Sequence, residues 1–203
     1  MAEIELYVDP VCPFGWVTAR WLLTASDSAD ADTVLRQMSL AALNEGHEVD
    51  TEHRPMIDRS RRVGRLFAAV SERYGIEGFG RLYPAFGIAT HGRGETMTAR
   101  GLSTLLAGVD LDPALAEAVG DPAWDEAVTE AHRASQRALG ERGGCPIISI
   151  GGRGFFGPVL TEIPGPRQGA RLLEALVTAA STPGFAELRR PYSGPPRTVS
   201  PGD

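Results

Sequence analysis

The order of the predicted elements indicates an α/β fold that a helical insertion interrupts, and three observations lead to this prediction. The first is a strand–helix–strand beginning. Ile4–Val8 is a short apolar run, Trp16–Thr24 has helical spacing, and Thr33–Leu40 is predicted as a second strand. The second is the stretch from Met56 to Gly140, where only helical patterns occur. The third is the return of β-character after this stretch.

The helical stretch has clear internal boundaries. Asp112-Pro113 and Asp121-Pro122 each place a capping residue before a proline that suits the first position of a helix. In the helix that follows, apolar and small residues recur on one face, which predicts its buried side. We expect that face to consist of Trp124, Val128, Ala131, Ser135 and Leu139.

The last third of the chain completes the order. Pro146–Ile150 and Phe155–Phe156 flank a glycine-rich turn, which predicts a β-hairpin, and Arg167–Ala180 is predicted as a final helix. No helix start and no Lys-Ser/Thr pair follows these glycines, so we do not interpret them as a phosphate site. This is the order of a thioredoxin fold with a helical insertion domain. We expect a thioredoxin-like domain at 1–55 and 141–192, the insertion at 56–140, and a flexible or draped tail at 193–203.

The composition narrows the function. The chain has 203 residues, 42% of them hydrophobic, and a formal net charge of −6, which argues against nucleic acid or a membrane surface as partner. No apolar run is long enough to span a bilayer, and Met1–Glu5 lacks the features of a secretory signal, so we predict a cytoplasmic protein. All 20 basic residues are arginine. This excludes a lysine Schiff base and a P-loop lysine, and it suggests a GC-rich genome such as that of an actinobacterium.

A cysteine lies at the predicted turn between the first strand and the first helix. In the run Asp9-Pro-Val-Cys-Pro-Phe-Gly-Trp16, Cys12 precedes Pro13, which suits the first helical position. Unpaired N–H groups and the dipole of the helix start favour a thiolate, which is the nucleophilic form. The spacing is that of a C-x-x-C motif, except that Gly15 stands at the second cysteine position. We interpret Cys12 as a reactive monothiol; the alternative is a buried structural cysteine.

The second cysteine, Cys145, directly precedes Pro146 at the start of the returning strand. In thioredoxin folds a proline at this position is cis and faces the active-site cysteine. If Pro146 is cis, Cys145 lies close to Cys12 and its backbone can bind a thiol compound. A disulfide between the two cysteines requires Cα atoms within about 7 Å. Cys145 is therefore either a possible resolving cysteine or a packing residue.

The four histidines show no metal-ligand spacing, and no metal site is predicted. Surface or capping roles are expected for them, except for His91. This residue lies at a glycine-flanked joint between helices and is a candidate acid/base or ligand contact over the active site. Arginines also cluster at the start of the insertion. We interpret this cluster as a solvated helix face; the alternative is that one of its members binds a substrate carboxylate. The cluster consists of Arg54, Arg59, Arg61, Arg62 and Arg65.

Taken together, these segments resemble the DsbA-like mycothiol-dependent nitroreductase family of actinobacteria along nearly the whole chain. The resemblance implies a thioredoxin fold with a helical insertion, and the use of mycothiol to reduce disulfides or electrophilic, including nitro-bearing, substrates. It also implies Cys12 as the nucleophile, Asn44 near the thiol-binding cleft and His91 in the helical lid. The matching stretches are Asp9–Trp16, Met38–Glu45, Gly144–Ile148, Phe155–Leu160 with Ile163-Pro164, and Phe185–Arg190.

The chain departs from the C-P-W-C motif of that family. Gly15 replaces the resolving cysteine and Phe14 replaces a tryptophan, while Cys145 stands where threonine is usual and Arg54 where a tyrosine is expected. A monothiol cannot close a C-x-x-C disulfide, but a second mycothiol can resolve a mixed disulfide on Cys12 by thiol–disulfide exchange. The residues expected to bind the thiol or the substrate are Pro13, Phe14, Trp16, Asn44, Arg54, His91 and Pro146.

These observations predict a thiol-dependent oxidoreductase, a monomer or homodimer, in which Cys12 acts on a disulfide or small electrophilic substrate. Mycothiol or another low-molecular-weight thiol is the expected cosubstrate. Two alternatives stay open. The first is a thiol-dependent isomerase or transferase of a small conjugated molecule, similar to the kappa-class transferases and chromene-carboxylate isomerases, with a role in natural-product biosynthesis. Such an isomerase would regenerate its thiol instead of consuming it. A non-catalytic binding module would show sluggish alkylation of Cys12.

Overall fold

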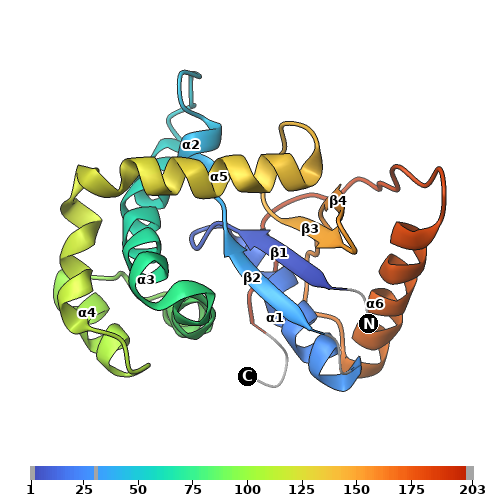
Figure 1. The fold of residues 1–203 in the computed structure, drawn as a ribbon, viewed down its shortest axis with the longest axis horizontal. Coiled ribbons are helices and arrows are strands. Elements are labelled where there is room, and N and C mark those ends of the chain that lie inside the picture. Colours follow the sequence, from blue (N-terminus) through green and yellow to red (C-terminus); the bar gives the residue numbers. More distant parts are fainter. Residues whose placement is uncertain (1–2, 30–31, 200–203) are drawn as a thin grey trace.

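A mixed four-stranded sheet lies at the centre of the molecule (Figure 1). The computed structural model describes residues 3–29 and 32–199. The strands are β1 (Ile4–Val8), β2 (Thr33–Gln37), β3 (Ile147–Ile150) and β4 (Arg153–Phe156), in the order β2-β1-β3-β4. β1 pairs in parallel with β2 and antiparallel with β3, and β3 and β4 form an antiparallel hairpin.

Helices surround this sheet. α1 and α6 pack against each other, α5 crosses the sheet from β2 to β4, and α3 contacts β2 (Figure 1). The helical elements are α1 (Pro13–Ala29), α2 (Leu40–Leu43), α3 (Arg54–Gly87), the π-helix η1 (Ile88–Gly92), α4 (Ala99–Ala107), the 3₁₀-helices η2 (Pro113–Gly120) and η3 (Pro122–Trp124), α5 (Asp125–Leu139) and α6 (Pro166–Ser181).

β1 is buried along most of its length, because it is paired on both sides and covered by helices. Its Leu6 aligns with Leu35 of β2 and with Ile148 of β3, and all three side chains are buried. This environment explains why the strand is a nearly continuous apolar run instead of a strict alternation. The turn that contains Cys12 follows the carboxyl end of β1 and therefore lies in the middle of the molecule.

Most of the elements predicted from the sequence are confirmed, including β1, the β3–β4 hairpin and α6. The prediction of a second strand as far as Leu40 is wrong at its end, because the strand stops at Gln37. Ser39 is extended, with φ −137°, and its Oγ accepts the N–H of Ala42 at 3.1 Å. A capping serine thus starts the short helix α2 directly after the strand.

The two predicted Asp-Pro helix starts are also present. The carboxylates of Asp112 and Asp121 accept the backbone N–H groups of Ala114 and Ala123, each at 2.9 Å. The helices that they begin are short 3₁₀-helices, and α5 follows at Asp125. His132 differs from the surface role expected of it, because it is buried on the inner face of α5.

The helical stretch between β2 and β3 shares its core with the sheet. Trp16 of α1 packs against Tyr83 of α3, with ring centroids 6.2 Å apart. This approach requires Gly87, because a Cβ there would lie 2.1 Å from an atom of the Trp16 ring. Four aromatic rings of α3 extend the cluster, with neighbouring centroids between 5.1 and 6.3 Å apart: Phe67, Phe79, Tyr83 and Phe86. The domain boundaries given above stay a prediction.

The segment after α6 runs along the molecule without a further helix or strand as far as residue 199. The backbone N–H of Arg197 donates to the carbonyl oxygen of Thr161 at 2.8 Å, so this part of the expected tail is draped on the protein. Residues 200–203 lie outside the described residues. Across residues 3–29 and 32–199, no helix combines the length and apolar character needed to cross a membrane.

Candidate active site

Cys12 lies at the turn between β1 and α1, as predicted. Its backbone N–H donates to the carbonyl oxygen of Asp9 at 3.0 Å, and Pro13 is the first residue of α1. The backbone N–H of Gly15 points back to the sulfur of Cys12, with a distance of 3.4 Å from nitrogen to Sγ. The residue is only 5% exposed. A donor of the first helical turn therefore faces the sulfur, and this arrangement stabilises negative charge there.

Cys145 lies next to this turn, and the Cys145–Pro146 peptide is cis. The Cys12 thiol lies 3.8 Å from the carbonyl oxygen of Cys145, within the range of a weak S–H···O hydrogen bond. The sulfur of Cys145 accepts the backbone N–H of Asp9 at 3.3 Å. Burial raises the pKa of the Cys145 thiol well above its usual value, and the neighbouring Cys12 side chain raises it further. Both cysteines are free, so Cys145 is a buried neutral thiol in this state.

Gly15 provides the space that Cys145 occupies. A Cβ placed on Gly15 would lie 2.7 Å from the sulfur of Cys145, closer than nonbonded atoms approach, and 3.5 Å from the Cβ of Cys12. The side-chain position at residue 15, the fourth of the C-x-x-C spacing, is thus filled by the sulfur of a residue from another part of the chain.

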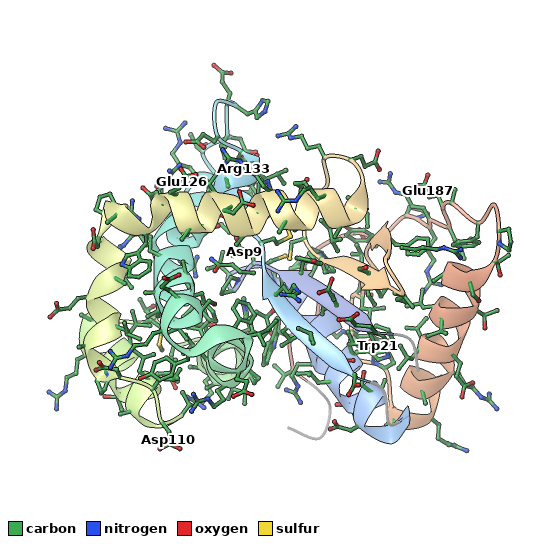
Figure 2. All side chains as sticks on the ribbon, in the orientation of Figure 1. Asp9, Trp21, Asp110, Glu126, Arg133 and Glu187 are labelled. Atoms are coloured by element: carbon green, nitrogen blue, oxygen red, sulfur yellow. The ribbon has the colours of Figure 1, made fainter. Side chains whose placement is uncertain are left out.

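Asp9 holds the turn in place, a role that the sequence analysis missed. Its carboxylate accepts the backbone N–H groups of Val11 at 2.9 Å and Leu40 at 2.7 Å, and also the hydroxyl of Ser60. The side chain is 1% exposed at the end of β1, where Figure 2 shows it beneath α5. Burial raises the pKa of Asp9, and its hydrogen bonds oppose this shift. The i to i+2 bond to Val11 is an Asx-turn, so the signal was present in the Asp-Pro-Val run.

A buried hydroxyl lies within electrostatic range of the same site. Tyr83 of α3 is 2% exposed, and its hydroxyl has no hydrogen-bond partner among the described residues. Burial raises the pKa of Tyr83, and negative charge on Cys145, Cys12 and Asp9 raises it further. The hydroxyl is therefore an unused donor within electrostatic range of both thiols. Because Tyr83 stands among apolar residues on a long helix, no sequence motif marks it.

His91 and Trp16 hold the other side of the turn. His91 is in η1, and its Nε2–H donates to the carbonyl oxygen of Pro10 at 2.9 Å, which fixes the tautomer. Its ring stacks on Trp16 with centroids 6.0 Å apart. Burial lowers the pKa of His91, the bond to Pro10 opposes this shift, and the charge of Arg59 adds to it. A neutral His91 thus binds the Cys12 turn, and its role as a ligand contact or acid/base over the active site stays a prediction.

The C-terminal segment passes over the same residues. The ring of Tyr192 packs on Phe14 with centroids 5.3 Å apart. The indole N–H of Trp16 donates to the carbonyl oxygen of Thr198 at 3.1 Å, and the Thr198 hydroxyl donates to the carbonyl oxygen of His91 at 2.8 Å. The sequence analysis did not place this segment at the site.

Comparison with known proteins agrees with this geometry. Residues 11–190 match the model of the Rv2466c-like family, which is described as mycothiol-dependent nitroreductase Rv2466c. The chain belongs to this family. Because the match covers most of the chain, the resemblance drawn from the sequence is confirmed, and the description of the family points to a thiol-dependent enzyme.

Solved structures with the same fold support the assignment of this Rv2466c-like protein to the DsbA-like thioredoxin fold. The probable DsbA oxidoreductase SCO1869 from Streptomyces coelicolor is 17% identical with a TM-score of 0.56, over 95% of this chain and 93% of that one. Cytosolic disulfide reductase DsbM from Pseudomonas aeruginosa, solved with GSH, is 15% identical with a TM-score of 0.56, over 87% and 99%. A 2-hydroxychromene-2-carboxylate isomerase is 13% identical with a TM-score of 0.57, over 86% and 94%.

Two of the expected binding residues of this Rv2466c-like protein make local contacts instead of meeting the cysteines. The side-chain amide of Asn44 donates to the carbonyl oxygen of Leu40 at 2.8 Å. Arg54 is exposed and donates to the carbonyl oxygen of Val49 at 3.2 Å. Their roles in thiol binding stay a prediction. Within residues 3–29 and 32–199, no three His, Cys, Asp or Glu side chains gather closely enough to hold a metal ion.

Proposed function

We propose that this Rv2466c-like protein is a thiol-dependent oxidoreductase whose nucleophile is Cys12. Mycothiol, or another low-molecular-weight thiol, is the cosubstrate, and the substrate is a disulfide or a small electrophile. The observation that carries the proposal is the Gly15 N–H, which points at the Cys12 sulfur from the first turn of α1 at 3.4 Å. The family description and the glutathione in the DsbM structure support a small thiol as the second reactant. A cytoplasmic location fits such a cosubstrate and is part of the proposal.

With a disulfide substrate, the chemistry is two exchanges on one sulfur. The Cys12 thiolate attacks one sulfur of the substrate, the substrate S–S bond breaks, and one thiolate leaves while the other half stays on Cys12 as a mixed disulfide. A thiolate of the cosubstrate then attacks the substrate sulfur of this mixed disulfide, releases Cys12 and forms a cosubstrate–substrate disulfide. A second cosubstrate thiolate attacks the cosubstrate sulfur of that disulfide, releases the other substrate half as a thiol and forms the cosubstrate disulfide. Two electrons thus pass from two cosubstrate thiols to one substrate disulfide, and no other redox group is required.

The side chains around Cys12 would position it for this chemistry. Asp9 and His91 bind neighbouring residues of the turn, Val11 and Pro10, and so help to keep the sulfur oriented toward the Gly15 N–H. The carbonyl oxygen of Cys145 lies 3.8 Å from Cys12 Sγ, where it could accept a hydrogen bond from a thiol compound bound at Cys12. These contacts are made before any substrate binds, which lowers the cost of reaching the reactive arrangement.

The test is turnover with reduced mycothiol and hydroxyethyl disulfide, followed by chromatography of all thiols and disulfides. We expect Cys12→Ser to abolish turnover, while Thr104→Ala, at an exposed position of α4, keeps it. Two mycothiols should be consumed for each substrate disulfide reduced. Turnover that survives in Cys12→Ser would exclude Cys12 as the nucleophile.

A thiol-dependent isomerase is the second candidate, favoured by the fold shared with the chromene-carboxylate isomerase. In that reaction a thiolate would add reversibly to a conjugated double bond and leave after rotation about the resulting single bond. The thiol is then regenerated in every cycle. Constant total thiol during conversion of a conjugated substrate would favour this candidate, whereas oxidation of thiol to disulfide would favour the oxidoreductase.

A further inference from the structure

We propose that Cys145 is the second redox sulfur of this protein, and that Cys12 and Cys145 alternate between two thiols and one internal disulfide. The proposal rests on the proposed function, because it requires Cys12 to form a mixed disulfide. It goes further in assigning the resolving step to the protein itself instead of a second small thiol.

The first support is the position of the Cys145 sulfur. In a C-x-x-C motif the second sulfur is carried by the residue three places after the nucleophile, which here is Gly15. Gly15 has no side chain, but the sulfur of Cys145 lies 2.7 Å from the point that its Cβ would take. That point is 3.5 Å from the Cβ of Cys12. A sulfur is therefore present beside Cys12 where the motif would place one, supplied by a different segment of the chain.

The second support is the set of donors around Cys145. The backbone N–H of Asp9 already donates to its sulfur at 3.3 Å. The hydroxyl of Tyr83, buried and without a partner among the described residues, is close enough to respond to charge on this sulfur. A packing cysteine needs no such donor, whereas a thiolate forming at Cys145 during the resolving step would accept the Asp9 N–H and lie within electrostatic range of the Tyr83 hydroxyl.

The third support is the contrast in surroundings of the two sulfurs. Cys12 lies at the start of α1 with the Gly15 N–H directed at its sulfur, whereas burial raises the pKa of the Cys145 thiol. Both residues are buried, with 5% and 9% of their surfaces exposed. A two-step exchange requires one cysteine with a donor directed at its sulfur to attack first, and a neutral cysteine beside it to attack second.

The resolving step needs no reactant other than Cys145 and the mixed disulfide on Cys12. Cys12 carries the thiol R as Cys12–S–S–R, and the sulfur of Cys145 attacks the sulfur of Cys12. The Cys145 S–H bond and the S–S bond of the mixed disulfide break, the Cys12–Cys145 disulfide forms, and the departing R–S thiolate takes the proton as R–SH. Two molecules of the low-molecular-weight thiol then reduce the internal disulfide and leave as their own disulfide.

The experiment follows reduced protein after addition of one equivalent of mycothiol disulfide. Samples are quenched with iodoacetamide under denaturing conditions, and intact mass and peptide mapping locate each modification. In the wild type we expect a short-lived mycothiol adduct on Cys12, followed by a species lighter by two hydrogens with Cys12 and Cys145 linked. In Cys145→Ala the adduct should persist on Cys12, because intramolecular attack is lost. Its decay should have about one tenth of the wild-type rate, or a lower one.

The outcomes separate the two proposals. A wild-type adduct on Cys12 that lasts as long as in Cys145→Ala, with Cys145 alkylated by iodoacetamide, would overturn the internal disulfide and leave the proposed function intact. Absence of any adduct on Cys12 in both proteins would overturn both. Cys145→Ser serves as a second variant should the alanine variant fold poorly. The peptide map of the wild type needs neither variant, because it shows directly whether Cys145 is linked to Cys12 or free.

Discussion

The sulfur of Cys145 and the missing side chain of Gly15 compete for one space, since a Cβ on residue 15 would lie 2.7 Å from that sulfur. The two residues are far apart in the sequence, yet each determines what the other can be. A cysteine at 145 requires glycine at 15, and a larger residue at 15 requires the sulfur at 145 to move. The two positions should therefore behave as a coupled pair.

Gly15→Ala tests this coupling through stability. The methyl group overpacks the site, and we expect the free energy of unfolding to fall by about 1–3 kcal/mol. In the Cys145→Ala background, where the sulfur is gone, the same change should be neutral or stabilising by about 0.5–1 kcal/mol, as expected for Gly to Ala within a helix. Urea unfolding of all four proteins under reducing conditions measures the difference.

Gly80→Ala is the matched control for this cycle. Gly80 is exposed in α3, and a Cβ there would meet no atom within 4 Å. Its replacement should raise the free energy of unfolding only by the amount that Gly to Ala gives within a helix, with or without the Cys145 sulfur. Equal effects of Gly15→Ala with and without the Cys145 sulfur would contradict the steric relationship.

Asp9→Asn should destabilise the protein. The carboxylate of Asp9 accepts hydrogen bonds from Val11, Leu40 and Ser60, whereas an amide has one acceptor oxygen and two donor hydrogens. At least one backbone N–H would then face another donor. We expect a loss of about 1–3 kcal/mol in the free energy of unfolding at neutral pH. Asp110→Asn, on an exposed turn, should change it little.

The stability difference between the wild type and Asp9→Asn should depend on pH, and the sign of this dependence follows from the pKa of Asp9. Burial raises the pKa of Asp9 in the folded protein, so its stabilising contribution is fully present below the unfolded value of about 3.9 and is lost as pH rises through the folded pKa. The difference in free energy of unfolding between wild type and Asp9→Asn should therefore narrow as pH rises above about 4. A difference that widens there would mean that hydrogen bonds outweigh burial.

Tyr83→Phe should slow the resolving step without lowering the stability of the protein. The hydroxyl has no partner among the described residues, so its removal should leave stability unchanged or raise it by about 1 kcal/mol. If the hydroxyl stabilises a thiolate on Cys145, the decay of the Cys12–mycothiol adduct should slow and its pH profile should move to higher pH. Formation of the adduct should keep its rate. Slowing of both steps alike would indicate a general disturbance of the site.

Removal of the residues after Arg190 should expose the active site. Tyr192 and Thr198 would no longer cover Phe14, Trp16 and His91. We expect iodoacetamide to alkylate Cys12 about threefold to tenfold faster, since local opening limits access to a buried thiol. Tyr192→Ala, which removes only one ring, should give a smaller increase. Unchanged alkylation in the shortened chain would show that access to Cys12 does not pass beneath this segment.

Local sequence patterns are enough to predict the order of strands and helices and the place of Cys12. Both follow from local rules: apolar periodicity marks each element, and Pro13 after Cys12 marks the helix start. The sequence also carried the resemblance that the family match confirms. The capping role of Ser39 was within reach of the same rules, but the apolar residues that follow it masked the end of β2.

The groups that meet at the thiol come from distant segments of the chain, and the packing of the whole fold brings them together. Gly15 and Cys145 come together because β1 and β3 pair antiparallel in the sheet, and no local pattern in either segment records that contact. Tyr83 reaches the site through the packing of α3, and Thr198 through the course of the C-terminal segment. Contacts of this kind depend on the relative placement of whole elements, which long-range burial fixes and which sequence spacing does not contain.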